Sequence, residues 1–111
     1  MSEDLRDPDK AVDFIIATSA KFATAKSDRV YLEEFRKSKK AILMGQSPAK
    51  SAVEREQYAY AHPEYHELLA GIKAAIQIEE DLKWLLIAAQ LRVEIWRSKE
   101  ASNRNQDRAT R

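Results

Sequence analysis

The sequence contains no cysteine, and only two of its 111 residues are glycine and three are proline. The absence of cysteine excludes a disulfide framework, a thiolate zinc site and a cysteine nucleophile. An all-β sandwich or barrel of this length needs many more turn residues, so it is excluded as well. No stretch approaches the about 18 consecutive apolar residues of a membrane span, and the acidic N-terminus lacks the apolar run of a signal peptide. We therefore expect a soluble, cytoplasmic protein that does not engage a membrane.

The residues that are present favour a folded helical chain. Hydrophobic residues make up 44% of the sequence and charged residues 33%, which is unlike a disordered chain. The length suits one domain with a modest core. The prediction is an all-α protein of the helical-bundle or coiled-coil type, in which two long amphipathic helices are joined by a short one.

Start and stop signals divide the chain into three expected helices. Asp7 followed by Pro8 opens the first, over about residues 8–44, and Gly45 supplies its stop. The first helix carries an apolar stripe with spacings of mostly three, four or seven residues: Ala11, Phe14, Ile15, Phe22, Ala25, Leu32, Phe35, Ile42 and Leu43.

Two candidate starts precede the short second helix, over about residues 48–61. One is Ser47 before Pro48, and the other is the capping box of Ser51 and Glu54. A proline disfavours helix at the preceding residue and suits a first turn, so Pro63 separates the second helix from a third over about 63–101. Residues 1–101 are thus predicted to form one domain, followed by a flexible basic tail over 102–111.

The segment from Leu82 to Trp96 is apolar on most of its circumference, more than one neighbouring helix can cover. In a chain with only two long helices, another copy is the most economical cover, so we expect a homo-oligomer. The predicted interface residues are Leu82, Trp84, Leu86, Ala89, Val93 and Trp96.

Charge is distributed in blocks of alternating sign, although the net charge is only +1. Residues 1–20 and 51–81 are acidic, whereas residues 21–50 and 82–111 are basic. Such blocks indicate either pairing between helices or subunits, or a basic surface for a polyanion. The basic residues expected to contact DNA phosphates are Lys26, Arg29, Arg36, Lys37, Lys39, Lys40, Arg97, Lys99 and Arg104. The alternative is a solvated surface whose cations complement the C-terminal ends of helices.

Two other groups of residues, a tyrosine cluster and a histidine pair, give weaker indications of a binding site. Three tyrosines surround His62-Pro63 and could stack on unpaired bases, but their helical spacing favours packing of the turn onto the core. His62 and His66 stand one helical turn apart, yet two imidazoles without a third ligand do not make a metal site.

Glu33-Glu34 and Glu79-Glu80-Asp81 invite comparison with the helical nucleotide pyrophosphohydrolases, whose EExxE and ExxD motifs are broken here by Lys37 and Lys83. No nucleophilic triad or phosphate loop is present either. We expect no enzymatic activity, no catalytic residue, no metal and no cofactor.

Residues 31–44 and 84–104 resemble a group of small helical proteins of tailed phages and prophages, most without assigned function. More remotely, the layout is similar to the family of the phage recombination mediator UvsY. The shared features are a lysine-rich helix, a glycine break, a central tryptophan and a basic-serine turn: Arg36 to Lys40, Gly45, Trp84 and Arg97-Ser98. This resemblance implies ring-like oligomers that bind single-stranded DNA and help to load a recombinase.

The functional expectation is an oligomeric accessory protein of phage recombination or replication that binds single-stranded DNA without sequence preference, in contact with a recombinase or a single-strand-binding protein. Cations on phosphates carry affinity but read no sequence. The alternative is a protein-interaction module that binds no nucleic acid, such as a phage assembly chaperone, an adaptor or a host-directed inhibitor.

Overall fold

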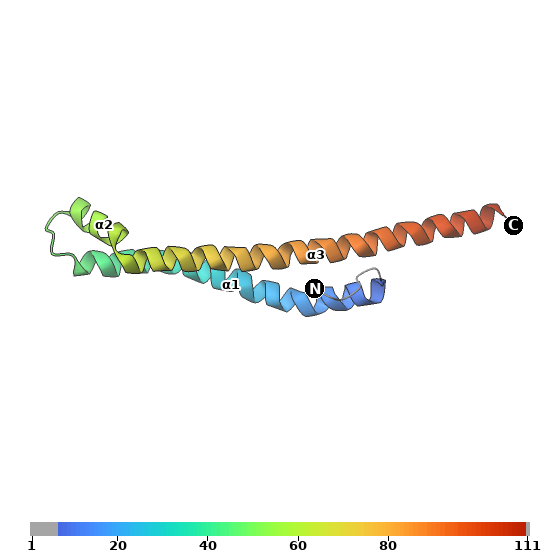
Figure 1. Cartoon of the computed structure of the whole chain (residues 1–111), viewed down its shortest axis with the longest axis horizontal. Helices are drawn as coiled ribbons and strands as arrows, with labels where there is room; N and C mark the ends of the chain where they lie inside the picture. Colours follow the sequence, from blue (N-terminus) through green and yellow to red (C-terminus); the bar gives the residue numbers. More distant parts are fainter. Residues whose placement is uncertain (1–6, 111) are drawn as a thin grey trace. The chain divides into compact units, whose positions relative to one another are not determined.

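The computed structural model describes residues 7–110, which fold into three α-helices (Figure 1). The helices are α1 (Pro8–Gln46), α2 (Ala52–Ala61) and α3 (Pro63–Ala109). No strand occurs between residues 7 and 110. The predicted all-α class, with two long helices and one short helix, is therefore confirmed.

The chain divides into two compact units, although its sequence predicts a single domain over residues 1–101. One unit combines the start of the chain up to Phe22 with the chain from Asp81 onward. The other unit comprises Ala23–Glu80 and includes α2. Each unit contains a section of α1 and a section of α3, because both long helices continue across the division.

The start of α1 follows the sequence signal, but its end does not. The Asp7 carboxylate accepts a hydrogen bond from the Asp9 amide at 2.9 Å, as a capping residue does. The helix continues through Gly45 to Gln46, beyond the predicted stop. Gly45 does not adopt a positive φ, so it does not form the left-handed cap that a terminating glycine supplies. A single glycine costs a helix only about 1 kcal/mol relative to alanine, which α1 tolerates in its last turn.

Of the two candidate starts of α2, the capping box is the one that forms. The Ser51 hydroxyl accepts from the Glu54 amide at 3.1 Å, and the helix begins at Ala52. The Ser47 hydroxyl instead accepts from the Ala49 amide at 3.1 Å, which shapes the connection. The predicted start near residue 48 is therefore too early. The predicted end at residue 61 is correct, because the His62 backbone is extended and its N–H donates to the Ala59 carbonyl.

The Ser51 cap provides a small but measurable test of this boundary. We expect Ser51→Ala to lower the free energy of unfolding by about 1 kcal/mol, because it removes a partner of an otherwise unsatisfied helix N–H. Urea unfolding followed by circular dichroism measures the change. The matched control is Ser38→Ala in the middle of α1, at an exposed position where alanine is a better helix former. Equal stability of the two variants would contradict the cap.

The least exposed positions of both long helices follow heptad spacing. Along α3, one row of buried and half-buried positions has separations that alternate between three and four residues: Tyr65, Leu68, Ile72, Ala75, Glu79, Leu82, Leu86, Ala89 and Val93. Along α1, the corresponding positions are Ala11, Ile15, Thr18, Phe22, Ala25, Arg29, Leu32, Lys39 and Leu43. This is the pattern of a coiled-coil seam. We call these two sets the inner seam; it includes polar members that the predicted apolar stripes omit.

The main hydrophobic cluster lies in the unit that contains α2. Leu43 and Ala59 are fully buried, Tyr65 is almost so, and Met44 packs against them. The Tyr60 and Tyr65 rings meet edge to face, with their centroids 5.3 Å apart. These contacts attach the turn around Pro63 to the ends of the long helices. They agree with the interpretation that the tyrosines pack the turn onto the core.

The predicted flexible tail is helical as far as the structure describes it. Residues 102–109 continue α3, and the last turn is closed by a bond from the Thr110 amide to the Gln106 carbonyl at 3.1 Å. The predicted end near residue 101 is therefore wrong. The segment contains no glycine or proline, and a helix that is already nucleated gains one hydrogen bond for each added residue. All side chains from Ala101 to Thr110 are exposed, and Arg111 lies outside the described residues.

Candidate nucleic-acid interface

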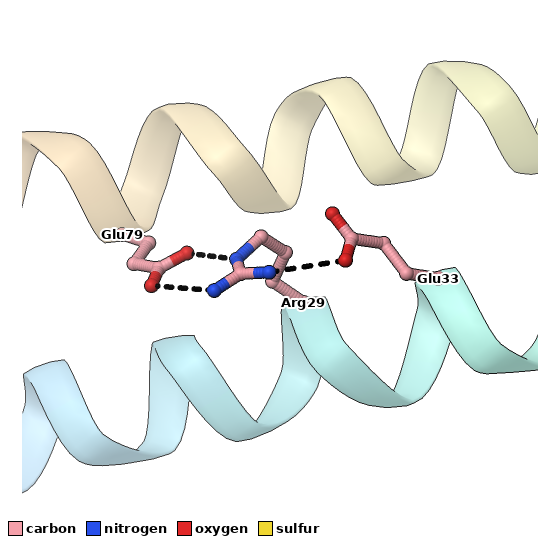
Figure 2. Close-up of polar contacts among 3 residues, drawn as sticks. All are labelled: Arg29, Glu33 and Glu79. Carbon is pink, nitrogen blue, oxygen red and sulfur yellow. Dashed lines mark hydrogen bonds and ion pairs between the residues drawn. The ribbon is translucent and has the colours of Figure 1, made fainter.

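Arg29 belongs to the inner seam rather than to an outer basic strip. Its Nη2 donates to Glu79 Oε1 at 3.1 Å and its Nε donates to the other carboxylate oxygen, which makes a two-pronged ion pair between α1 and α3 (Figure 2). A third donor, Nη1, reaches Glu33 at 3.0 Å, one turn along α1. The side chains of Arg29 and Glu79 are only 23% and 11% exposed.

This pair gives Arg29 a structural role. Hydrogen bonding to Glu79 is the main cause that raises the pKa of Arg29, so the guanidinium stays charged while it is held in the seam. Paired guanidinium and carboxylate groups satisfy each other's hydrogen bonds where partial burial would otherwise penalise either charge. Arg29 is therefore a poor candidate for contact with DNA, because its donors point at carboxylates of its own chain.

Lys39 and Lys40 are likewise occupied within the chain. Lys39 Nζ lies 2.9 Å from Glu64 Oε2, and this contact lowers the pKa of Glu64. Lys40 Nζ lies 3.3 Å from Glu56 Oε1 and 4.8 Å from the centroid of the Tyr60 ring. Hydrogen bonding to Tyr60 and then to Glu56 raises the pKa of Lys40. Both lysines join α1 to the chain after residue 50, so they are poor candidates for phosphate contacts.

The other predicted cations of α1 face solvent. Lys26, Arg36 and Lys37 are exposed. Lys37 Nζ lies 3.2 Å from Glu34 Oε2, but the two side chains are 75% and 67% exposed. An ion pair this open to water is worth little and can be exchanged for another anion. The six predicted α1 cations therefore reduce to three that can reach a ligand.

The last turns of α3 present a more regular arrangement of cations. Figure 1 shows this end of α3 running past the start of α1. Arg97, Arg104 and Arg108 fall within about 40° of one another around the helix, and all three are exposed. We call these three residues the arginine face. A shallow hollow beside the last two of these arginines is lined by Ala101, Arg104, Asn105 and Arg108. Arg108 is absent from the predicted site residues, although its spacing from Arg97 places it on the same face.

Contacts within the chain leave the arginine face accessible. Arg97 Nη1 lies 3.7 Å from Glu94 Oε1, with both side chains about two-thirds exposed. Arg104 Nε donates to the Glu100 carbonyl at 3.4 Å, which uses one of the five donors of the guanidinium. A second hollow, earlier along the helix, is lined by Arg92, Ile95, Trp96 and Lys99. It brings together Lys99, which is predicted to contact DNA, and Trp96, which is predicted to lie in the oligomer interface. Trp96 is 44% exposed and lies between the two cations along the helix.

The predicted oligomer-interface residues separate into two groups. Ala89 is fully buried and Leu82, Leu86 and Val93 are half-buried within the single chain, because they belong to the inner seam. Their burial within one chain makes these four poor candidates for an intermolecular surface. In contrast, Trp84 is 60% exposed and Trp96 is 44% exposed. Two residues that the prediction omits, Leu91 and Ile95, are 56% and 45% exposed on the same segment.

The histidine pair serves the turn between α2 and α3. His62 Nδ1 accepts from the Glu64 amide at 3.0 Å, whereas His66 Nε2 lies 2.9 Å from the Tyr60 carbonyl oxygen. Within residues 7–110, no group of three or more side chains is placed to hold a metal ion. No helix in the described part of the chain combines the length and apolar character needed to cross a bilayer.

Comparison with known proteins adds no relative. The chain matches no protein-family model, no curated protein and no solved structure.

Proposed function

We infer that the chain binds single-stranded DNA, without sequence preference, through the C-terminal part of α3. The observation that carries this proposal is the arginine face, in which three exposed guanidinium groups repeat along one side of a helix. Guanidinium groups bind phosphates bidentately, and a row of them follows a phosphate backbone. Such contacts bind the backbone and carry no sequence information.

The proposal favours single strands because an aromatic ring accompanies the cations. Trp96 is exposed between Arg92 and Lys99, on a part of the helix that continues into the arginine face. An unpaired base can stack on such a ring, whereas a base within a duplex presents no free face. Lys26, Arg36 and Lys37 on α1 form a secondary cationic surface for the same polyanion.

The wider role follows from the sequence resemblance. Likeness to small phage proteins and to recombination mediators supports an accessory role in phage recombination or replication, in which the chain acts on DNA together with a recombinase or a single-strand-binding protein. The mechanism is electrostatic and needs no catalytic residue. Several copies acting on one strand would raise the affinity beyond that of a single site.

The test is a salt-titrated binding assay with a fluorescent single-stranded oligonucleotide. We expect the triple variant Arg97→Glu, Arg104→Glu and Arg108→Glu to lose at least about 100-fold in affinity at 50 mM salt, and to lower the slope of log affinity against log salt by about 2. The matched control is Lys10→Glu, Lys21→Glu and Lys73→Glu, which changes the net charge equally at exposed positions on different faces. The control should retain most of the affinity.

Stacking is tested separately in a Trp84→Phe background, where Trp96 is the only tryptophan. Its fluorescence should be quenched by a single-stranded oligonucleotide and much less by a duplex of the same sequence. Equal losses in the two triple variants would overturn the assigned site. Absence of salt-dependent binding by the unaltered chain would overturn DNA binding and favour the protein-interaction module.

A further inference from the structure

We propose that two copies of the chain pair in parallel through an outer face of α3 formed by Trp84, Ala88, Leu91 and Ile95. This surface differs from the inner seam and is not required by the proposed DNA binding. All four residues are exposed, with exposed fractions of 60% for Trp84, 56% for Leu91 and 45% for Ile95. They lie within the unit that contains the C-terminal section of α3.

The outer face has the spacing of a second coiled-coil seam. Its four residues are separated by four, three and four positions, and they lie on the side of α3 opposite Leu82, Leu86, Ala89 and Val93. Asp81 and Ser98 end the stripe with polar groups. A helix with apolar stripes on two opposite sides is suited to contact two neighbours. The inner seam is covered within the chain, so the outer face is available for a second copy.

The residue types on the outer face favour a parallel pair. In heptad notation for this second seam, Ala88 and Ile95 occupy a positions and Leu91 occupies a d position. A β-branched residue at a with leucine at d favours two-stranded parallel coiled coils. Ala88 lets the two helices approach closely beside the large Trp84 rings, which occupy the preceding d layer.

The flanking charges distinguish parallel from antiparallel pairing. One edge of the outer face carries Glu94 at a g position, whereas the other edge carries Arg92 and Lys99 at e positions. In a parallel pair, each g position faces the e position of the next heptad on the partner, so Glu94 of each copy faces Lys99 of the other. An antiparallel pair brings like edges together and leaves these charges without opposite partners. The exposed contact between Glu94 and Arg97 at 3.7 Å costs little to exchange.

Parallel pairing has a consequence for the rest of α3. It places both arginine faces at the same end of the pair, because Arg97, Arg104 and Arg108 are C-terminal to the outer face in α3. A single strand could then engage two sets of cations at once. Lys99 is assigned to pairing between copies rather than to DNA.

Cysteine cross-linking tests the pairing and its polarity, because the chain itself contains no cysteine. In a parallel pair Leu91 faces its own counterpart, so Leu91→Cys should form disulfide-linked dimers nearly completely under mild oxidation with glutathione disulfide. The control Gln90→Cys, an exposed residue away from the outer face, should cross-link at least about tenfold more slowly. Cross-linking only when Ala88→Cys and Leu91→Cys chains are mixed would overturn the parallel arrangement.

Charge exchange provides a test without a covalent bond. We expect light scattering to give twice the 12.7 kDa of one chain for the unaltered protein. Glu94→Lys and Lys99→Glu should each weaken the pair by about tenfold, and an equimolar mixture of the two variants should restore it. Restoration on mixing is not expected if the two residues act only within their own chain, and its absence would overturn the assigned ion pair.

A last variant separates pairing from folding. The double variant Leu91→Glu and Ile95→Glu should be a monomer with unchanged helix content by circular dichroism, since both positions are exposed in the single chain. The control Ile16→Glu alters an apolar residue of α1 that is 69% exposed, and it should remain a dimer. A monomeric unaltered protein at about 100 μM, or a dimeric double variant, would overturn the proposal. Neither measurement uses nucleic acid, so failure here is distinct from failure of DNA binding.

Discussion

Replacing Leu43 by alanine should lower the free energy of unfolding by about 3 kcal/mol. Leu43 is the one large side chain that is fully buried in the described part of the chain, and it packs in the cluster with Ala59 and Tyr65. The substitution removes apolar contacts and leaves a cavity that the rigid ends of the helices cannot close completely. For a domain of this size the loss is a large fraction of the total stability.

The neighbouring residue Ile42 is the matched control for this prediction. It is 50% exposed on the same helix, so Ile42→Ala removes a side chain of equal size with much less loss of buried surface. Urea unfolding monitored by circular dichroism gives both free energies. If the two variants differ by less than about 0.5 kcal/mol, the cluster around Leu43 is not the main packing site.

Removing one partner of the Arg29–Glu79 pair should destabilise the fold nearly as much as Leu43→Ala does. Removing both partners should have little effect on stability. We expect Arg29→Met and Glu79→Leu each to lower the melting temperature by roughly 10 °C, because each leaves a poorly solvated polar group in the seam. The double variant places two apolar side chains in a coiled-coil seam and should melt within about 3 °C of the unaltered chain. Differential scanning calorimetry of the four proteins completes the double-mutant cycle.

The exposed pair of Lys37 and Glu34 serves as the control for this cycle. Its atoms are 3.2 Å apart, but both side chains are mostly in water. We expect Lys37→Met to change the melting temperature by less than about 2 °C. Additive effects in the Arg29–Glu79 cycle would show that the two groups act independently and that the pair does not link α1 to α3.

The residues expected to bind DNA show what local spacing in the sequence can predict and what it cannot. Spacing alone places Arg97 and Arg104 on one face of a helix, and the same rule would have included Arg108. Spacing could not show that Arg29 turns inward, because its partner Glu79 lies 50 residues away along the chain. The partner of Lys40, Glu56, lies 16 residues away, across a turn and on another helix. These cations lose their availability through contacts that only the folded hairpin creates.

The predicted interface shows the same division for apolar residues. The periodicity of α3 identifies two apolar stripes, but it does not say which one the chain covers itself. Burial assigns Leu86, Ala89 and Val93 to the inner seam and leaves Trp84 and Leu91 outside. Self-association is still predicted from the apolar circumference of the segment from Leu82 to Trp96. The residues expected to mediate it are now those of the exposed stripe.

The sequence by itself determined the all-α class and the helix boundaries at Asp7 and His62-Pro63, because capping and proline geometry depend on residues within a few positions of each other. It offered two starts for α2, of which the structure forms the one at Ser51. Only the tertiary structure decided which cations remain accessible and which apolar stripe faces outward. Those properties depend on side chains brought together from distant segments, where a carboxylate or a neighbouring helix occupies a surface that local periodicity leaves undetermined. The extension of α3 to Ala109 also belongs to the structure, since the polar composition of its last turns does not itself prevent a nucleated helix from continuing.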